Sequence, residues 1–108
     1  MNNHIFKLAF FSTQKYDIKA FQAHCPHNLK ITFFNEQLNP HTAVLAHGFD
    51  GVCSFVNDDL SEQTLIVLSK YKINFITLRC AGFNNVDMQT ANKLKMVVTR
   101  VPSYSPEA

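Results

Sequence analysis

The feature that most constrains the fold of this sequence is a regular alternation of short apolar runs with segments of helical character. Five runs are rich in β-branched and aromatic residues and are nearly continuously apolar: residues 5–11, 29–34, 51–56, 74–78 and 96–99. Such runs are typical of strands in a parallel sheet that is covered on both faces. The pattern therefore predicts buried strands rather than half-exposed ones.

Helical signals fill the gaps between these runs, at residues 17–24, 40–46, 61–71 and 87–93. Asn39, Ser61 and Asp87 are the expected N-caps, and Gly48 follows the end of the second segment. In the third segment we expect Leu65, Leu68 and also Ile66 to face inward. Strict alternation of strand and helix predicts an α/β fold. We expect a flavodoxin-like, doubly wound parallel sheet of about five strands, with helices on both faces.

Length and composition restrict the class of protein. A chain of 108 residues has room for one compact domain. Its net charge of +2 gives no reason to expect nucleic acid or an anionic membrane as a partner. No apolar run approaches the ~18 residues that would span a bilayer. Three cysteines at irregular spacing are typical of thiols in a reducing compartment, so we expect a cytoplasmic protein.

The last residues contain the start of a helix. Ser105 is a suitable N-cap, Pro106 suits the first helical position, and Glu107 suits the first turn. We expect residues 1–101 to form the domain and 102–108 to form a hinge and the beginning of a helix that continues beyond them. The alternative is a frayed polar tail.

In an open parallel sheet, ligands bind beyond the carboxyl ends of the strands, which directs attention to residues 12–14, 55–59, 79–85 and 100–104. Gly82 allows a ligand to approach the backbone closely, and Ala81 before it leaves room for that approach. Consecutive amides there could hold an anion such as a carboxylate. The alternative is an ordinary turn between a strand and a helix.

Other chemistry-bearing residues favour structural roles. Asp58 and Asp59 could serve acid–base chemistry or a metal, but paired acids before a helix more often cap it. Residues 24–27 (HCPH) lack the second ligand cluster that a zinc site needs. Cys53 suits a small core position. Arg79 could bind an anion or pair with a carboxylate.

The glycine content excludes one class of site. The chain has only three glycines and contains no G-x-G-x-x-G or phosphate-loop motif. It therefore does not bind the pyrophosphate of a dinucleotide through a glycine-rich turn, which is the usual mode.

Four segments resemble a known family: residues 11–17 (FSTQKYD), 52–59 (VCSFVNDD), 78–87 (LRCAGFNNVD) and 101–108 (VPSYSPEA). They are similar to the D-isomer-specific 2-hydroxyacid dehydrogenases, and within them to the fermentative NAD-dependent D-lactate dehydrogenases of bacteria. The resemblance runs over the whole chain in one register. It implies a substrate-binding domain followed by an NAD-binding Rossmann domain, with residues 102–108 at the crossing.

The resemblance also implies roles for particular residues. The amides of Ala81 and Gly82 would hold the substrate carboxylate, and Tyr104 and Phe55 would line the substrate pocket. The reaction would be hydride transfer from NADH to pyruvate, yielding D-lactate. The catalytic Arg, Glu and His and the glycine-rich turn for NAD belong to the family's second domain. We therefore expect no catalytic, cofactor or metal residue in this chain, and no turnover by the chain alone.

A different class of function stays open, namely a free-standing flavodoxin-like binding or regulatory module without catalysis. One version of it fails on the sequence, and a flavin-binding version is only weakly supported. A receiver domain needs an acidic pair where Ser12 and Thr13 stand, and a flavin site needs a glycine in the same turn. A remnant domain that acts only by self-association is a third reading. Apolar surface left by a cut hinge helix would then make a homo-oligomer a candidate assembly.

Overall fold

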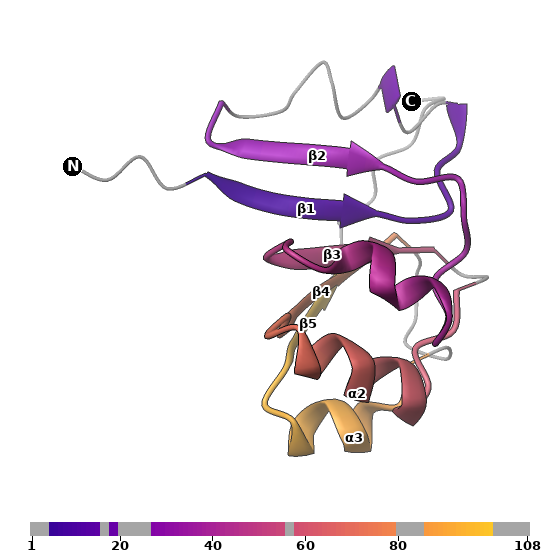
Figure 1. The fold of residues 1–108 in the computed structure, drawn as a ribbon, viewed down its shortest axis with the longest axis vertical. Coiled ribbons are helices and arrows are strands. Elements are labelled where there is room, and N and C mark those ends of the chain that lie inside the picture. The colour runs from indigo at the N-terminus through magenta and orange to yellow at the C-terminus, as the bar shows by residue number, and fades with distance from the viewer. Residues whose placement is uncertain (1–4, 16–17, 20–26, 56–57, 80–85, 101–108) are drawn as a thin grey trace.

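A computed structural model of the chain describes residues 5–15, 18–19, 27–55, 58–79 and 86–100. Five parallel strands form one sheet: β1 (Phe6–Phe10), β2 (Leu29–Phe33), β3 (Gly51–Ser54), β4 (Phe75–Leu78) and β5 (Val97–Arg100) (Figure 1). Each lies within the predicted apolar run or within one residue of it. The order in the sheet is β2-β1-β3-β4-β5, which confirms the flavodoxin-like arrangement.

The strand order reverses between β1 and β3. From β1 the chain moves outward to β2 and then returns to β3 on the other side of β1. Crossovers on either side of such a point leave its strand ends uncovered, which is where ligands bind in open α/β sheets. The carboxyl ends of β1 and β3 therefore define the place to look for a site.

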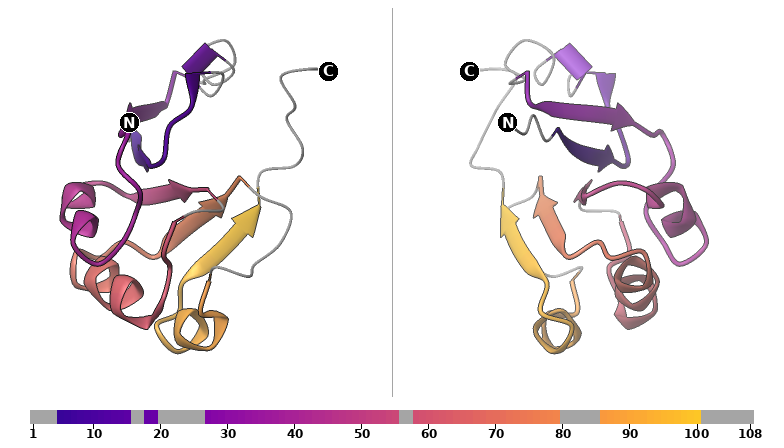
Figure 2. Two further views of the ribbon diagram at one scale, coloured as in Figure 1. Left: turned by 90° about the vertical axis from the view of Figure 1, so that its right-hand side faces the viewer. Right: turned by 60° about the vertical axis from the view of Figure 1, so that its left-hand side comes forward.

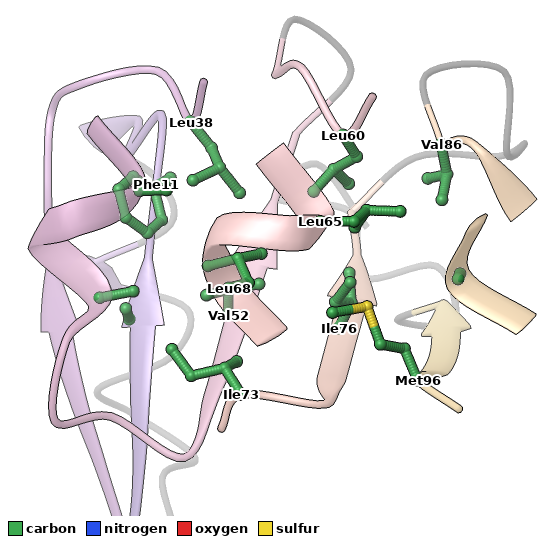
Figure 3. Packing of buried hydrophobic residues seen from close by; sticks show 14 of the residues in the cluster. Phe11, Leu38, Val52, Leu60, Leu65, Leu68, Ile73, Ile76, Val86 and Met96 are labelled. Atoms are coloured by element: carbon green, nitrogen blue, oxygen red, sulfur yellow. The ribbon is translucent and has the colours of Figure 1, made fainter. Parts of the chain in front are cut away.

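Three helical elements cover one face of the sheet: the 3-10 helix η1 (Thr42–Ala46) and the α-helices α2 (Glu62–Lys70) and α3 (Met88–Lys93) (Figure 2). Leu65 and Leu68 of α2 pack against Val52 of β3 and Ile76 of β4, and all four side chains are fully buried (Figure 3). At about 25 cal/mol per Å² of apolar surface removed from water, this layer is the main source of stability in the described part of the chain.

The second predicted helix is shorter than expected and is a 3-10 helix. Asn39 is not its N-cap, because His41 occupies that position. The side-chain oxygen of Asn39 instead accepts from the backbone N–H groups of His41 (2.8 Å) and Thr42 (2.9 Å) in the turn that precedes the helix. The helix itself begins only at Thr42, whose hydroxyl donates to the carbonyl of Gln37 (2.6 Å) and holds the first turn tight. Gly48 follows the end of the helix with φ +90, a conformation that favours glycine.

The two α-helices match their predicted caps, with one correction in their packing. Asp87 caps α3 by accepting from the backbone N–H of Thr90 (3.1 Å), and Ser61 stands at the N-cap of α2. Ile66, however, is 39% exposed. Thr64, Leu65 and Leu68 already form the buried stripe of α2, and Ile66 lies one helical step beyond it.

The opposite face of the sheet carries a second, smaller apolar group. Leu8, Phe10 and Cys53 are buried there, and four partly buried side chains pack around them: Phe6, Leu29, Ile31 and Phe33. Cys53 is thus a core residue, as predicted. The expected helix at 17–24 lies almost entirely outside the described residues. In the part of the chain that the structure describes, no helix is long and apolar enough to cross a membrane.

One glycine is required by packing. The rings of Phe6 and Phe75 meet edge to face at 5.6 Å across the start of β3. A Cβ atom on Gly51 would lie 2.9 Å from Cδ2 of Phe75 and 3.0 Å from Cζ of Phe6. Both rings reach each other over β3 because this position has no side chain.

Candidate substrate site at the strand ends

A compact polar cluster lies at the carboxyl ends of β1, β3 and β4. Ser12 follows β1, Phe55 and Asp58 follow β3, and Arg79 follows β4. Ser12, Asp58 and Arg79 are all buried, whereas Phe55 is partly exposed. The cluster therefore occupies the point where the strand order reverses, with one aromatic ring at its accessible side.

Ser12 turns the chain sharply at the end of β1. Its φ of 55 lies in the left-handed region, which costs a residue other than glycine on the order of 1 kcal/mol. Several hydrogen bonds compensate: its N–H donates to the carbonyl of Glu36 (2.8 Å), and its hydroxyl donates to Oδ1 of Asp58. Its carbonyl accepts from the side-chain amide of Gln14 (3.0 Å). The turn is thus held by the segments around it.

Asp58 connects the ends of three strands. Its Oδ1 accepts from the N–H of Leu38 (2.9 Å), in the connection that follows β2, as well as from the hydroxyl of Ser12. Its Oδ2 accepts from the N–H of Phe55 (2.8 Å), at the end of β3. One carboxylate thereby fixes the relative positions of the chain segments that leave β1, β2 and β3.

The pKa of Asp58 is raised above its ordinary value. Burial of the carboxyl group is the main cause, because a charge is poorly solvated there. The hydrogen bonds from Ser12, Phe55 and Leu38 and the positive charge of Arg79 oppose this shift in part. Backbone N–H groups donate to both oxygens, from Leu38 to Oδ1 and from Phe55 to Oδ2.

Arg79 joins β4 to the same cluster. Its Nη2 donates to the carbonyl of Ser12 at 2.9 Å, and its Nη1 lies 3.6 Å from the sulfur of Cys53. The guanidinium carbon is 4.1 Å from the ring centroid of Phe10 and 5.0 Å from that of Phe55. The two roles predicted for Arg79, binding an anion and pairing with a carboxylate, stay predictions, because its hydrogen bond described here goes to a backbone carbonyl. Its charge acts on Asp58, and its hydrogen bond holds the β1 turn.

The predicted site residues have different outcomes. Phe55 lies at the expected edge of the sheet, with its ring against the guanidinium of Arg79. Ala81, Gly82 and Tyr104 lie outside the described residues, so their roles stay predictions. Within the described part of the chain, no group of three histidine, cysteine or acidic side chains could hold a metal ion.

The expectation that Asp58 and Asp59 cap a helix is wrong for both, because Ser61 is the N-cap of α2 and Asp59 lies two residues before it. The carboxylate of Asp59 accepts from the N–H of Ser61 (2.8 Å), directly before α2. Asp58 instead turns into the protein. Sequence reasoning missed it as the central anchor, and also missed the contribution of Ser12. The available signal was their place directly after two strands that flank the reversal in strand order.

Residues 8–108 match the model of a protein family described as "D-isomer specific 2-hydroxyacid dehydrogenase, catalytic domain". Over 103 residues the chain is 47% identical to D-lactate dehydrogenase of Escherichia coli, which covers 94% of this chain and 31% of that protein. Among solved structures, Salmonella D-lactate dehydrogenase superposes with a TM-score of 0.86 at 47% identity, over 94% of this chain and 31% of that one.

A more distant similarity extends the comparison to a complex with a cofactor. D-lactate dehydrogenase with NAD+ from Lactobacillus jensenii superposes with a TM-score of 0.79 at 30% identity. It covers 94% of this chain and 32% of the solved chain. The chain thus spans about a third of the length of the relatives that it matches.

Proposed function

We propose that this chain, which belongs to the D-isomer-specific 2-hydroxyacid dehydrogenases, is the substrate-binding portion of an NAD-dependent D-lactate dehydrogenase. The observation that carries the proposal is the combination of 47% identity to the Escherichia coli enzyme with a matching sheet order. The reaction would be reduction of pyruvate to D-lactate, in the cytoplasm.

The substrate pocket would lie beside the cluster of Ser12, Asp58 and Arg79. Backbone amides of Ala81 and Gly82 would bind the carboxylate of the 2-keto acid, and Phe55 and Tyr104 would line the pocket. The partly exposed ring of Phe55 at the reversal in strand order supports this arrangement. An apolar wall with a few convergent polar groups suits a small substrate such as pyruvate.

The described strand ends do not fit a nicotinamide dinucleotide. The turn after β1 contains no glycine, and its hydrogen-bonding groups are engaged by Glu36, Asp58 and Arg79. A pyrophosphate needs a glycine-rich turn at a helix N-terminus. We propose that residues 102–108 begin the crossing to a Rossmann domain that would bind NAD and supply the catalytic Arg, Glu and His, which is supported by the chain spanning about a third of the length of its relatives.

The proposal can be tested on the protein as its source cells make it. An antibody raised against this chain would isolate the native protein, whose mass and NADH-dependent reduction of pyruvate are then measured. We expect a band roughly three times heavier than 12.3 kDa, given the 31% coverage of the relatives, and D-lactate as the product. The 108-residue chain alone should show no turnover.

The opposite result would favour a binding module. A native band at 12.3 kDa without pyruvate reduction would remove the dehydrogenase assignment. A heavier protein that yields L-lactate, or that reduces no 2-keto acid, would contradict it as well.

A further inference from the structure

The side chain of Arg79 contacts partners at the end of β1 and in β3. It reaches the carbonyl of Ser12 beyond β1 and the sulfur of Cys53 in β3, while its own N–H donates to the carbonyl of Ser54 (2.9 Å). The backbone of this residue is therefore bonded to the neighbouring strand β3, and its guanidinium reaches past β3 to the turn after β1. The end of β4 cannot move relative to β1 and β3 without breaking these contacts.

The guanidinium also lies against two aromatic rings. Phe10 belongs to the buried face of β1, whereas the ring of Phe55 is partly exposed at the end of β3. A planar cation in contact with an aromatic face restricts how that ring can turn, and such a contact is worth about 0.5–2 kcal/mol. The orientation of Phe55 thus depends on Arg79 on its ring side and on Asp58 at its backbone N–H.

The charges in the cluster explain why an arginine stands here. A buried guanidinium is costly without hydrogen bonds and an opposite charge. The carbonyl of Ser12 accepts one of these hydrogen bonds, and the positive charge of Arg79 lowers the pKa of Asp58, a smaller influence than the burial that raises it. An apolar residue would fill the space without holding the β1 turn, and a lysine would present a single ammonium in place of a planar fork.

We propose that Arg79 is a positioning residue for substrate, which acts by holding the ring of Phe55 and the end of β4 in place. It does not touch the 2-keto acid itself. This inference rests on the proposed function, because Phe55 lines a substrate pocket only if the chain belongs to a 2-keto acid reductase. In the sequence, Arg79 also stands two and three residues before Ala81 and Gly82, the proposed carboxylate-binding residues.

The test uses steady-state kinetics of the whole protein encoded by the gene, with pyruvate and NADH. Arg79→Met keeps the apolar stem of the side chain and removes the guanidinium. We expect the KM for pyruvate to rise about tenfold or more, because misplacing groups that orient a substrate weakens productive binding. We expect kcat per NADH-binding site to change less, and the Kd for NADH to stay the same.

A second variant and a matched control keep the test decisive. Arg79→Lys retains the charge and should raise the KM for pyruvate by a smaller factor, about threefold. Lys30→Met removes a positive charge from an exposed position on β2 of the same sheet, and it should leave both constants unchanged. Counting active sites by NADH binding corrects for any loss of folded protein.

The outcomes separate the two proposals. If the unaltered protein does not reduce pyruvate, the proposed function fails and this inference falls with it. If the unaltered protein is active but both Arg79 variants keep its KM for pyruvate, Arg79 serves stability alone and only this inference is wrong. That result would appear as fewer NADH-binding sites at an unchanged KM.

Discussion

The helix-covered face of the sheet and the carboxyl ends of its strands are both buried, but they are specified in different ways. The face is an apolar layer in which any well-fitting side chain would serve, with Leu68 and Ile76 as fully buried examples. At the strand ends, by contrast, Ser12, Asp58 and Arg79 depend on particular donors and acceptors at 2.8–2.9 Å. Volume and hydrophobicity define the first region, whereas hydrogen-bond geometry defines the second.

The largest effect should come from removing the carboxylate at the strand ends. Asp58→Ala leaves the N–H groups of Leu38 and Phe55 without their acceptor and leaves Arg79 without its nearby negative charge. We expect the free energy of unfolding of the chain to fall by about 4 kcal/mol. Urea denaturation followed by circular dichroism measures it.

The neighbouring carboxylate is the matched control for that substitution. Asp59 is exposed and accepts one hydrogen bond before α2. Asp59→Ala should cost no more than about 1 kcal/mol. Equal losses in the two variants would show that Asp58 is no more than a loop acid and would remove the contrast between the two regions.

A truncation on the helix-covered face should have a slightly smaller effect. Leu68→Ala leaves a cavity between α2 and the sheet and should lower the free energy of unfolding by about 3 kcal/mol. Ile66→Ala on the same helix, at a side chain that is 39% exposed, should cost much less. The same denaturation experiment compares them, and a loss at Ile66 as large as that at Leu68 would contradict the packing described for α2.

A substitution at Gly51 shows whether a position restricted by packing can lose as much free energy of unfolding as a position in the polar cluster. Gly51→Ala places a methyl group against the rings of Phe75 and Phe6, at 2.9 and 3.0 Å, and should cost about 2 kcal/mol. In a Phe75→Val background the penalty for the same substitution should shrink, because valine has no δ carbon and the closest atom, Cδ2 of Phe75, is absent. A penalty that is identical in both backgrounds would show that the rings are not its cause.

The smallest effect concerns a carboxylate outside both regions, Asp87 at the start of α3. Hydrogen bonds from the backbone N–H and the hydroxyl of Thr90 lower the pKa of Asp87 below 3.8. Its stabilising contribution is therefore present above pH 3.8 and is lost as the pH falls through the lower, folded-state pKa. Asp87→Asn should weaken the chain slightly at neutral pH, with a difference from the unaltered chain that shrinks in acid.

The shift at Asp58 has the opposite sign. Because burial raises its pKa above 3.8, ionisation of Asp58 costs stability as the pH rises from that value through the folded-state pKa. Unfolding measured in urea across a pH series should show this dependence in the unaltered chain and not in an Asp58→Asn variant. A dependence that persists in the variant would belong to another group.

The sequence predicted the sheet much better than the cluster at its edge. Apolar runs reveal strands because burial on both faces leaves few polar side chains, and Ser61 and Asp87 marked the starts of α2 and α3 because both are typical N-cap residues. The role of Asp58 could not be predicted in this way, because two aspartates before a helix do not show whether a side chain caps the helix or is buried in the protein. The buried position of Asp58 becomes evident only in the folded structure, where the hydroxyl of Ser12, 46 residues away in the sequence, donates to its carboxylate.

Those long separations have a kinetic consequence. The bond from Arg79 to the carbonyl of Ser12 joins residues 67 positions apart, and Asp58 receives donors 46 and 20 positions away. Because such bonds need several crossovers to close first, we expect them to form late in folding, after the rate-limiting step. Weakening them should therefore accelerate unfolding and leave the folding rate nearly unchanged. The hydrogen bonds at the carboxyl ends of the strands would then determine the unfolding rate of the domain, and with it the lifetime of the folded state.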